Sequence, residues 1–412
     1  MRIEEVKGRK ILDSRGDLTV EVEVKGGGGV GRGSAPSGKS RGKYEAVAFP
    51  SGGVDASLSL LKKELSPKLV GMELDFRKVD AFLREVDGTN NFSRIGGNLA
   101  VALSFAVAKA EASAKGLSLH LLLGKKTTLP LPLGNVLGGG AHAEGGRLDL
   151  QELLVIPVGA RSFQEAAFTN ARVHRKVGEL LKKKGRFVGG KGDEGAWISP
   201  WGSEESLNVV REACEEVEGE TGVKMRMGVD MAAGYLYDPK EERYVYPKEG
   251  RKLTKEEQME FAIELVENYD LLYLEDPLCE EDFQGFSTLL RKVGKKCLVC
   301  GDDLFATNVE RIEKGIEKKA MNAVLIKPNQ VGTLSETLEA IELVQEKKLV
   351  PVVSHRSGET TDETIAHLAV GKGCPLIKTG AVGGERISKL NELIRLQEEI
   401  GGKLAKIGLT GR

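Results

Sequence analysis

The sequence predicts an α/β protein in which an N-terminal α+β domain precedes a C-terminal α/β barrel of the TIM type. Short apolar runs with the length of buried strands, such as 271–274 and 323–326, alternate with stretches of helical spacing such as Asn308 to Met321. A charged residue follows most of these runs, where a strand would end. Roughly eight strand-helix units fit the second part of the chain, which is the number that closes a parallel barrel of this type.

The first part of the chain has a different pattern. Ile3 to Val24 alternates apolar and polar residues across Leu12–Gly16, which predicts an antiparallel hairpin. Gly26 to Gly33 is rich in glycine and indicates a flexible turn, and it lacks the lysine context of a nucleotide-binding loop. From Ala56 to Leu123 the spacing is mostly helical, and the small apolar residues of Leu99 to Ala114 predict a closely packed buried helix.

Length and composition agree with two domains. The chain has 412 residues, and the proline-punctuated stretch Thr127 to Pro132 is the expected boundary, so we predict an N-terminal α+β domain over 1–126 and the barrel over 127–412. The 60 basic and 61 acidic residues leave a net charge of −1, so no global field favours nucleic acid or a membrane surface. Because the N-terminus has no apolar signal segment and five cysteines suit no disulfide framework, we expect a cytoplasmic protein.

Cys297 and Cys300 form a CxxC pair, which in other settings binds a metal or carries redox chemistry. On a strand, however, their side chains would point to opposite faces. The sequence has no second CxxC and no nearby histidine to complete a tetrahedral set. We therefore predict that both cysteines pack in the core.

Polar and charged residues mark the strand ends of the second domain. Taken singly, each suits a helix cap or a solvated tip. Because the carboxyl ends of barrel strands share one rim, we expect these side chains to lie together there. They are His142, Gln151, Glu152, Glu194 on a glycine-flanked loop, Asp230, Glu275, Asp302, Lys327, His355, Arg356, Ser357 and Lys378.

Three of these residues predict a metal site. Asp230, Glu275 and Asp302 end successive predicted strands, and three uncompensated carboxylates on one rim would repel one another without a cation. Magnesium, a hard ion that prefers oxygen ligands, is the expected occupant. Lys327 and Lys378 would lie in the same pocket, where burial and a nearby cation lower the pKa of a lysine and allow it to act as a base.

A series of short motifs runs through the whole chain in a characteristic order. They are Ile11–Gly16, Val86–Thr89, Gly192–Gly195, Leu274–Pro277, Gly301–Leu304, Lys327 with Asn329–Gln330, Ser354–Glu359 and Ile377–Gly380. Together they resemble the enolase family over essentially the full length. The resemblance implies a carbon–oxygen lyase that reversibly dehydrates 2-phosphoglycerate to phosphoenolpyruvate in glycolysis and gluconeogenesis. It also implies a small phosphorylated acid as substrate and a homodimer or larger homo-oligomer.

The same resemblance implies two magnesium ions per active site. Asp230, Glu275 and Asp302 match the ligands of the tighter ion, and Ser40, on a loop that closes over the substrate, helps to hold the second. The two ions, with Lys378, would stabilise the dianion formed when the weakly acidic proton beside the substrate carboxylate is removed.

Residue roles in the reaction follow from the resemblance as well. Lys327 matches the base that removes the proton, and Glu194, assisted by Glu152, matches the acid that protonates the departing hydroxyl. His142 and His355 match pocket histidines, with a proton-transfer or hydrogen-bonding role left open. The residues expected to bind the substrate are Lys378, Arg356, Ser357 and Gln151. The histidines on helix-like stretches, which we interpret as structural, are His120, His174 and His367.

Several positions depart from the family pattern. Lys39 and Arg41 replace the usual alanine and threonine of the loop, and Pro328 follows the predicted base and restricts Lys327 to extended conformations. Two alternatives therefore stay open. One is a related lyase for a more anionic acid that Lys39 or Arg41 contacts. The other is a non-catalytic binding protein with the enolase fold, which is disfavoured because every acid, base and metal ligand is present.

Overall fold

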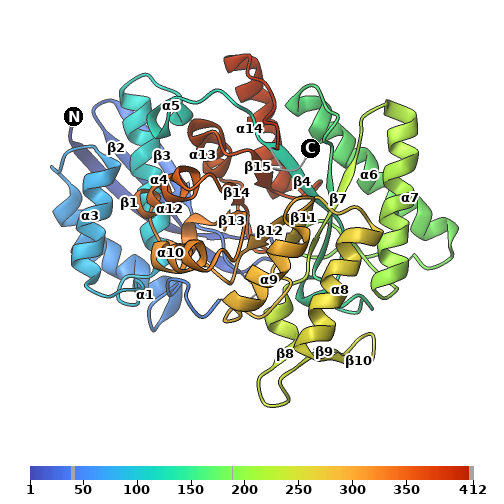
Figure 1. Cartoon of the computed structure of the whole chain (residues 1–412). Coiled ribbons are helices and arrows are strands. Elements are labelled where there is room, and N and C mark those ends of the chain that lie inside the picture. Colours follow the sequence, from blue (N-terminus) through green and yellow to red (C-terminus); the bar gives the residue numbers. More distant parts are fainter. Residues whose placement is uncertain (39–41, 188, 408–412) are drawn as a thin grey trace.

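A small antiparallel sheet and a group of helices form the N-terminal part of the chain (Figure 1). The computed structural model describes residues 1–38, 42–187 and 189–407. Strands β1, β2 and β3 pair in sequence order, which confirms the predicted hairpin and adds a third strand. The elements of this part are β1 Ile3–Leu12, β2 Leu18–Gly26, β3 Gly29–Ser34, α1 Gly53–Leu60, α2 Ser66–Leu69, α3 Phe76–Asp87, α4 Gly97–Ala114 and α5 Leu119–Leu123.

Strand β3 corrects the prediction of a flexible turn over Gly26–Gly33. Only Gly27 and Gly28 form the turn, and the alternate glycines of β3 face the buried helix α4. A Cβ atom at Gly31 would lie 2.1 Å from the carbonyl oxygen of Ala106. The glycines are therefore needed for a close approach between the strand and helix backbones. A glycine-rich composition alone does not distinguish this role from that of a flexible turn.

Replacing Gly31 with valine should destabilise the protein, because the new side chain meets backbone atoms of α4 that cannot move independently. We expect the free energy of unfolding to fall by about 1–3 kcal/mol, measured by urea denaturation. The control is Gly219→Ala on an exposed helical face, where a Cβ meets nothing within 4 Å, and there we expect a gain of about 0.5–1 kcal/mol. Equal stability of the Gly31 variant and the parent would refute the close packing of β3 on α4.

Eight strands form a closed barrel, because the last strand, β15, pairs with the first, β4. This ring, with the flanking helices, confirms the predicted α/β barrel. The order around the ring is β4 Leu131–Gly138, β5 Glu152–Ile156, β7 Arg226–Asp230, β11 Tyr273–Glu275, β12 Leu298–Gly301, β13 Ala323–Ile326, β14 Val350–Ser354 and β15 Leu376–Lys378. A two-residue strand, β6 Trp197–Ile198, pairs with β4 outside the ring.

Strand β5 departs from the expected all-parallel order, since it is antiparallel to both β4 and β7. The chain returns from β4 through residues 139–151 without a crossover helix, which an antiparallel neighbour does not need. As a result β5 starts at the rim where the parallel strands end, and its first residue, Glu152, lies opposite Asp230. The reversal therefore adds a carboxylate to that rim.

Helices surround the barrel, and a small three-stranded sheet projects from one end of it (Figure 1). No helix in the described ranges is both long and apolar enough to cross a membrane. The helices are α6 Phe163–Lys183, α7 Ser203–Thr221, α8 Lys255–Asn268, α9 Phe283–Val293, α10 Val309–Lys318, α11 Pro328–Val331, α12 Leu334–Glu346, α13 Thr364–Lys372 and α14 Gly384–Ile400. The strands of the projecting sheet are β8 Tyr237–Asp238, β9 Arg243–Tyr246 and β10 Arg251–Leu253.

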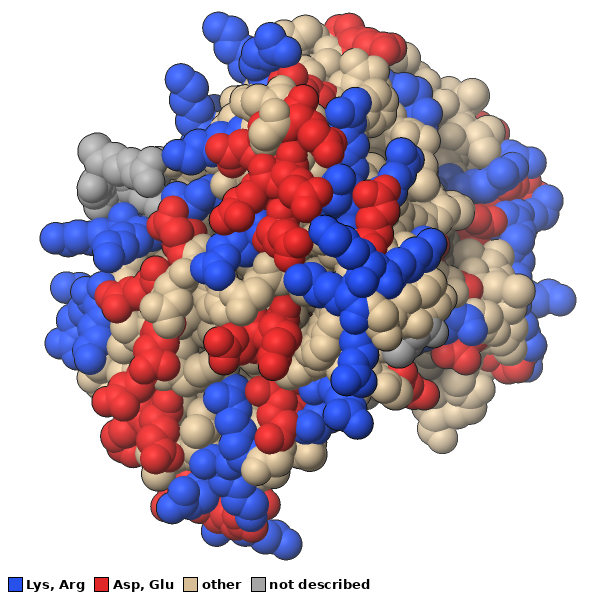
Figure 2. Space-filling model, turned by 90° about the vertical axis from the view of Figure 1, so that its right-hand side faces the viewer, with Lys and Arg blue, Asp and Glu red and all other residues tan. Residues whose placement is uncertain are grey.

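Two apolar layers hold the barrel together, one inside the ring and one between the strands and the helices. Successive residues around β12 alternate between them: Cys297 and Val299 belong to the outer layer, and Leu298 and Cys300 to the inner one. Both cysteines are fully buried, which confirms the prediction of core packing on opposite faces. Outside these layers, Figure 2 shows acidic and basic side chains interspersed over the face that α7 and α8 help to form.

Candidate active site

A pocket opens at the barrel rim, and residues from distant parts of the sequence line it. The N-terminal part contributes Gly38 and Glu45. Glu275 is not among the lining residues but contacts one of them, Lys378. Ser40 falls outside the described residues, as do Lys39 and Arg41. The predicted site residues that line the pocket are His142, Gln151, Glu152, Glu194, Asp230, Asp302, Lys327, His355, Arg356, Ser357 and Lys378.

Lys378, at the end of β15, is surrounded by carboxylates. Its Nζ atom lies 2.9 Å from Asp230 Oδ2, 2.8 Å from Glu275 Oε2 and 3.1 Å from Glu152 Oε1. Burial lowers the pKa of Lys378, but these carboxylates outweigh it and raise the pKa well above its ordinary value. The expected lowering of this pKa depends on the charge of a nearby cation, so it stays a prediction.

Lys327, at the end of β13, shows the same effect, since its ammonium group forms an ion pair with Asp302. Burial lowers the pKa of Lys327, and the Asp302 carboxylate more than compensates, so the pKa is raised. A lowered pKa for Lys327 beside a bound cation stays a prediction as well. Its backbone is extended, with φ −126° and ψ 105°, which confirms the restriction that Pro328 imposes.

The carboxylates around these lysines retain capacity for a cation. Glu275 Oε1 and Glu152 Oε2 are buried without a hydrogen-bond partner among the described residues. Burial, followed by the charge of Asp230, raises the pKa of Glu275 to about 8. A divalent cation would relieve both the repulsion and the missing contacts, so the donor set fits such an ion.

Two acidic residues that the sequence did not single out lie beside Asp302. Carboxylate oxygens of Asp276, Asp302 and Asp303 lie within 4.8 Å of one another. Asp276 accepts hydrogen bonds from the backbone amides of Asp302 (3.0 Å) and Asp303 (2.8 Å). Asp276 directly follows Glu275, and Asp303 directly follows Asp302. This adjacency to two predicted metal ligands was the signal available in the sequence.

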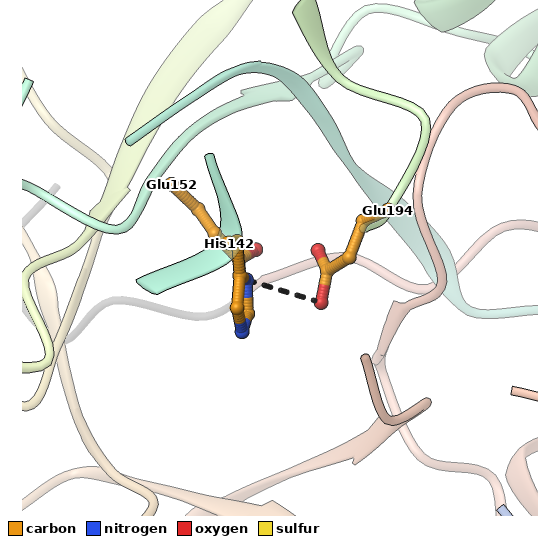
Figure 3. Close-up of side chains that lie close together, drawn as sticks. All are labelled: His142, Glu152 and Glu194. Atoms are coloured by element: carbon orange, nitrogen blue, oxygen red, sulfur yellow. Dashed lines mark ion pairs between the residues drawn. The ribbon is translucent and has the colours of Figure 1, made fainter. Parts of the chain in front are cut away.

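On another side of the pocket, His142 lies close to two glutamates (Figure 3). His142 Nδ1 is 3.7 Å from Glu152 Oε1 and 3.7 Å from Glu194 Oε1. His355 Nε2 approaches the same Glu194 oxygen at 3.3 Å, while Asn135 donates a 3.1 Å hydrogen bond to Glu194 Oε2. The predicted acid is thus enclosed by two imidazoles and an amide.

The two glutamates have pKa values shifted in opposite directions. Burial and then the charges of Glu194, Asp230 and Glu275 raise the pKa of Glu152 well above its ordinary value, despite Lys378. Burial acts in the same sense on Glu194, but the neighbouring His355, His142 and Arg386 hold its pKa well below the ordinary value. Of the two carboxylates, Glu152 therefore has the higher pKa.

Arg356 has a partner that the sequence did not reveal. Its guanidinium donates 2.8 Å and 3.0 Å hydrogen bonds to the two carboxylate oxygens of Glu45, and another of 2.9 Å to Asn329 Oδ1. Glu45 follows the loop of the N-terminal part, 311 residues away. No periodicity or spacing in the sequence connects the two residues.

The flanks of that loop are fixed to the barrel. Ser37 and Gly358 exchange backbone hydrogen bonds of 2.7 Å and 2.8 Å. The Ser37 hydroxyl donates a 2.8 Å hydrogen bond to Asp13 Oδ2, at the end of the N-terminal hairpin. The N-terminal part therefore contributes directly to one wall of the pocket.

The remaining histidines lie on helices α5, α6 and α13 and outside the pocket, as predicted. His120 and His367 stack with ring centroids 6.2 Å apart. His174 stacks on Trp197 at 5.2 Å, and its Nε2 lies 2.8 Å from the carbonyl oxygen of Gly195, next to Glu194. His174 therefore supports the loop that carries the predicted acid.

This support should depend on pH. Burial lowers the pKa of His174 from 6.5 to about 4, so below pH 6.5 the unfolded chain binds a proton that the folded protein excludes. The stability that the neutral His174 contributes should be complete above pH 6.5 and decrease by up to about 3 kcal/mol as the pH falls to 4. Urea denaturation of the parent and of His174→Gln should show a smaller pH dependence in the variant. Identical pH dependences would refute this account.

The fold and the rim together define a two-domain α/β-barrel protein equipped for acid–base chemistry beside a divalent cation. Two family models match the chain, the enolase N-terminal domain over residues 3–123 and the enolase C-terminal TIM barrel domain over residues 126–410. The chain belongs to the enolase family, and this makes it a carbon–oxygen lyase of the phosphopyruvate hydratase type, which confirms the resemblance seen in the sequence.

Curated relatives cover nearly the whole chain. The enolase of Methanothermobacter thermautotrophicus is 52% identical over 402 residues, which span 97% of each chain. That of Archaeoglobus fulgidus is 53% identical over 401 residues, or 97% of this chain and 98% of its own. The enolase of Halorubrum lacusprofundi is 48% identical over 403 residues, or 97% and 99%. Nothing in these comparisons favours a lyase for another acid or a non-catalytic binding protein.

Proposed function

We propose that this protein interconverts 2-phosphoglycerate and phosphoenolpyruvate with two magnesium ions per active site, and that Lys327 is the base and Glu194 the acid. The observation that supports this most strongly is the order of the strands. Lys327 directly follows β13 and Glu152 begins β5, and three strands separate β13 from β5 in either direction around the ring. A base and a proton source on opposite sides of one pocket suit the removal of a proton and a hydroxyl from opposite faces of a substrate.

The metal ligands in this proposal are Asp230, Glu275 and Asp302, with Ser40 at the second ion. Bound magnesium would supply positive charge for the developing dianion. Lys327 has its pKa raised by Asp302 when no ion is bound, so it can act as a base only when the charge of Asp302 is compensated. The carboxylate cluster thus couples cation binding to activation of the base.

On the acid side, Glu152 stores a proton and Glu194 delivers it to the departing hydroxyl. The opposite pKa shifts of the two glutamates support this division. His142, 3.7 Å from a carboxylate oxygen of each, lies close enough to contact both. This assignment gives Glu152 a defined role as the assistant of Glu194.

Four residues are proposed to bind the substrate. Arg356 and Ser357 contact the phosphate, for which a guanidinium fork is well suited, and Lys378 and Gln151 contact its carboxylate end. To bind the phosphate, Arg356 would have to share its guanidinium between the phosphate and Glu45, or exchange Glu45 for the phosphate. Arg356 is therefore already oriented by a carboxylate before a substrate arrives.

The wider organisation follows the family as well. We propose that the chain divides into domains at residues 126 and 127 and forms a homodimer or larger homo-oligomer. We also propose that it acts in the cytoplasm, in glycolysis and gluconeogenesis. Size-exclusion chromatography with light scattering tests the oligomer.

The test of the proposed function is an absorbance assay for phosphoenolpyruvate. Purified protein should form it from 2-phosphoglycerate when magnesium is present, and a chelator should stop the reaction until magnesium is restored. Turnover of a more highly charged 2-phospho acid but not of 2-phosphoglycerate would overturn the proposal.

A further inference from the structure

Arg386, near the start of α14, is a buried arginine in direct contact with the pocket. Its side chain is fully buried. Its guanidinium donates hydrogen bonds to the backbone carbonyls of Arg356 (2.5 Å), Ser357 (2.6 Å) and Asp193 (3.2 Å). It therefore joins the segment that carries Arg356 to the loop that carries Glu194.

A fourth contact of Arg386 has a chemical consequence. Its Nη1 atom lies 2.9 Å from Nδ1 of His355. A guanidinium has only donors, so Nδ1 must be the acceptor and cannot carry a proton. The single proton of the neutral imidazole is then on Nε2.

That Nε2 proton points into the acid side of the pocket. Nε2 lies 3.3 Å from Glu194 Oε1, and it has no well-aligned hydrogen-bond partner among the described residues. A cationic imidazole is disfavoured, because it would place a second N–H against the guanidinium. Burial, with Arg386 contributing, lowers the pKa of His355 to about 3 although Glu194 opposes this, which agrees with a neutral ring.

We propose that Arg386 is a positioning residue that holds His355 in the Nε2–H tautomer and thereby directs a neutral hydrogen-bond donor at Glu194. The tautomer follows from the contacts alone, and its importance for turnover rests on the proposed role of Glu194. When Glu194 has given up its proton, the Nε2–H group stabilises the resulting carboxylate without adding a charge to the pocket.

The tautomer can be measured without any substitution of Arg386. The protein has only five histidines, so ¹⁵N-histidine labelling and long-range ¹H–¹⁵N correlation give a short list of ring signals, and His355→Gln assigns those of His355. At pH 7 we expect a protonated Nε2 and an unprotonated Nδ1. A protonated Nδ1, either as the other tautomer or as the cation, would overturn the proposal.

Two variants of residues on α14 then separate a loss of His355 positioning from a loss of protein stability. Arg386→Lys keeps the charge but loses the planar fork. It should mix the tautomers of His355 and lower turnover of 2-phosphoglycerate on the order of 10- to 100-fold, the range known for losing a group that orients a metal-binding histidine. Exchange of the C2 proton, which depends on Lys327, should persist.

Lys389→Met is the matched control. Lys389 is equally buried and pairs with Glu359 at 2.8 Å, and among the described residues it makes no hydrogen bond to His355. Its loss should therefore lower stability while the His355 tautomer stays unchanged. A tautomer that is the same in Arg386→Lys and in the parent would overturn the positioning role. The expected tautomer in a protein that turns over no 2-phosphoglycerate would leave this inference standing and overturn the proposed function instead.

Discussion

Lys327→Ala is expected to lower turnover by about 10²–10⁴-fold, because it removes the base that starts the reaction. The same variant should no longer exchange the C2 proton of 2-phosphoglycerate with solvent deuterium. Magnesium binding should remain, since the carboxylate ligands are intact and Asp302 loses a competing lysine. ¹H NMR of the substrate in D₂O measures the exchange directly.

Glu194→Gln serves as the counterpart within the same pocket. It removes the acid and leaves Lys327 on the far side of the barrel unchanged, so turnover should fall while some proton exchange persists. Equal exchange rates in Lys327→Ala and the parent would place the base elsewhere. Loss of exchange in both variants would show that the two steps are not divided between these residues.

Asp302→Asn is expected to weaken magnesium binding by on the order of 10-fold or more, because one negative charge leaves the carboxylate cluster. Turnover should fall with it, since Asp302 is also the ion-pair partner of Lys327. The control is Asp282→Asn, at the N-terminus of α9, where the side chain accepts from Gly285 N and an asparagine can replace it. Calorimetry with magnesium on both variants checks the difference, and unchanged affinity in Asp302→Asn would refute the site.

Barrel geometry explains why so many pocket residues were predictable from sequence. Once alternating strand and helix patterns indicate a barrel, the ends of the parallel strands must share a rim. For Asp230, Glu275 and Lys378, a position at the end of an apolar run was enough to predict a place on this rim. Their mutual contacts, within 2.9 Å of the Lys378 ammonium, follow from that shared rim.

The direction of β5 could not be predicted in the same way. Its apolar run has the composition of any buried strand, and the segment before it carries no periodic signal. Only the pairing with β4 and β7 shows that the strand is reversed. Because β5 runs in the opposite direction, Glu152 lies at the rim as the first residue of its strand. The parallel strands place their last residues there.

Glu45 and Arg386 illustrate a second limit. Glu45 meets Arg356 across 311 residues, and Arg386 lies in a charged segment that is typical of an exposed helix, yet it is fully buried. Both contacts depend on how loops from separate elements meet, which local patterns do not encode. The ion pairs of Lys327 and Lys378 are a related case, since the sequence predicts one rim shared by lysines and carboxylates but not which of them form ion pairs.

One NMR time course tests the central claim most directly. The unsubstituted protein is incubated with 2-phosphoglycerate and magnesium in D₂O. The account predicts that phosphoenolpyruvate appears and that the remaining 2-phosphoglycerate gains deuterium at C2, with both changes absent after chelation. A folded, magnesium-saturated protein that produces neither phosphoenolpyruvate nor C2 deuteration would contradict it.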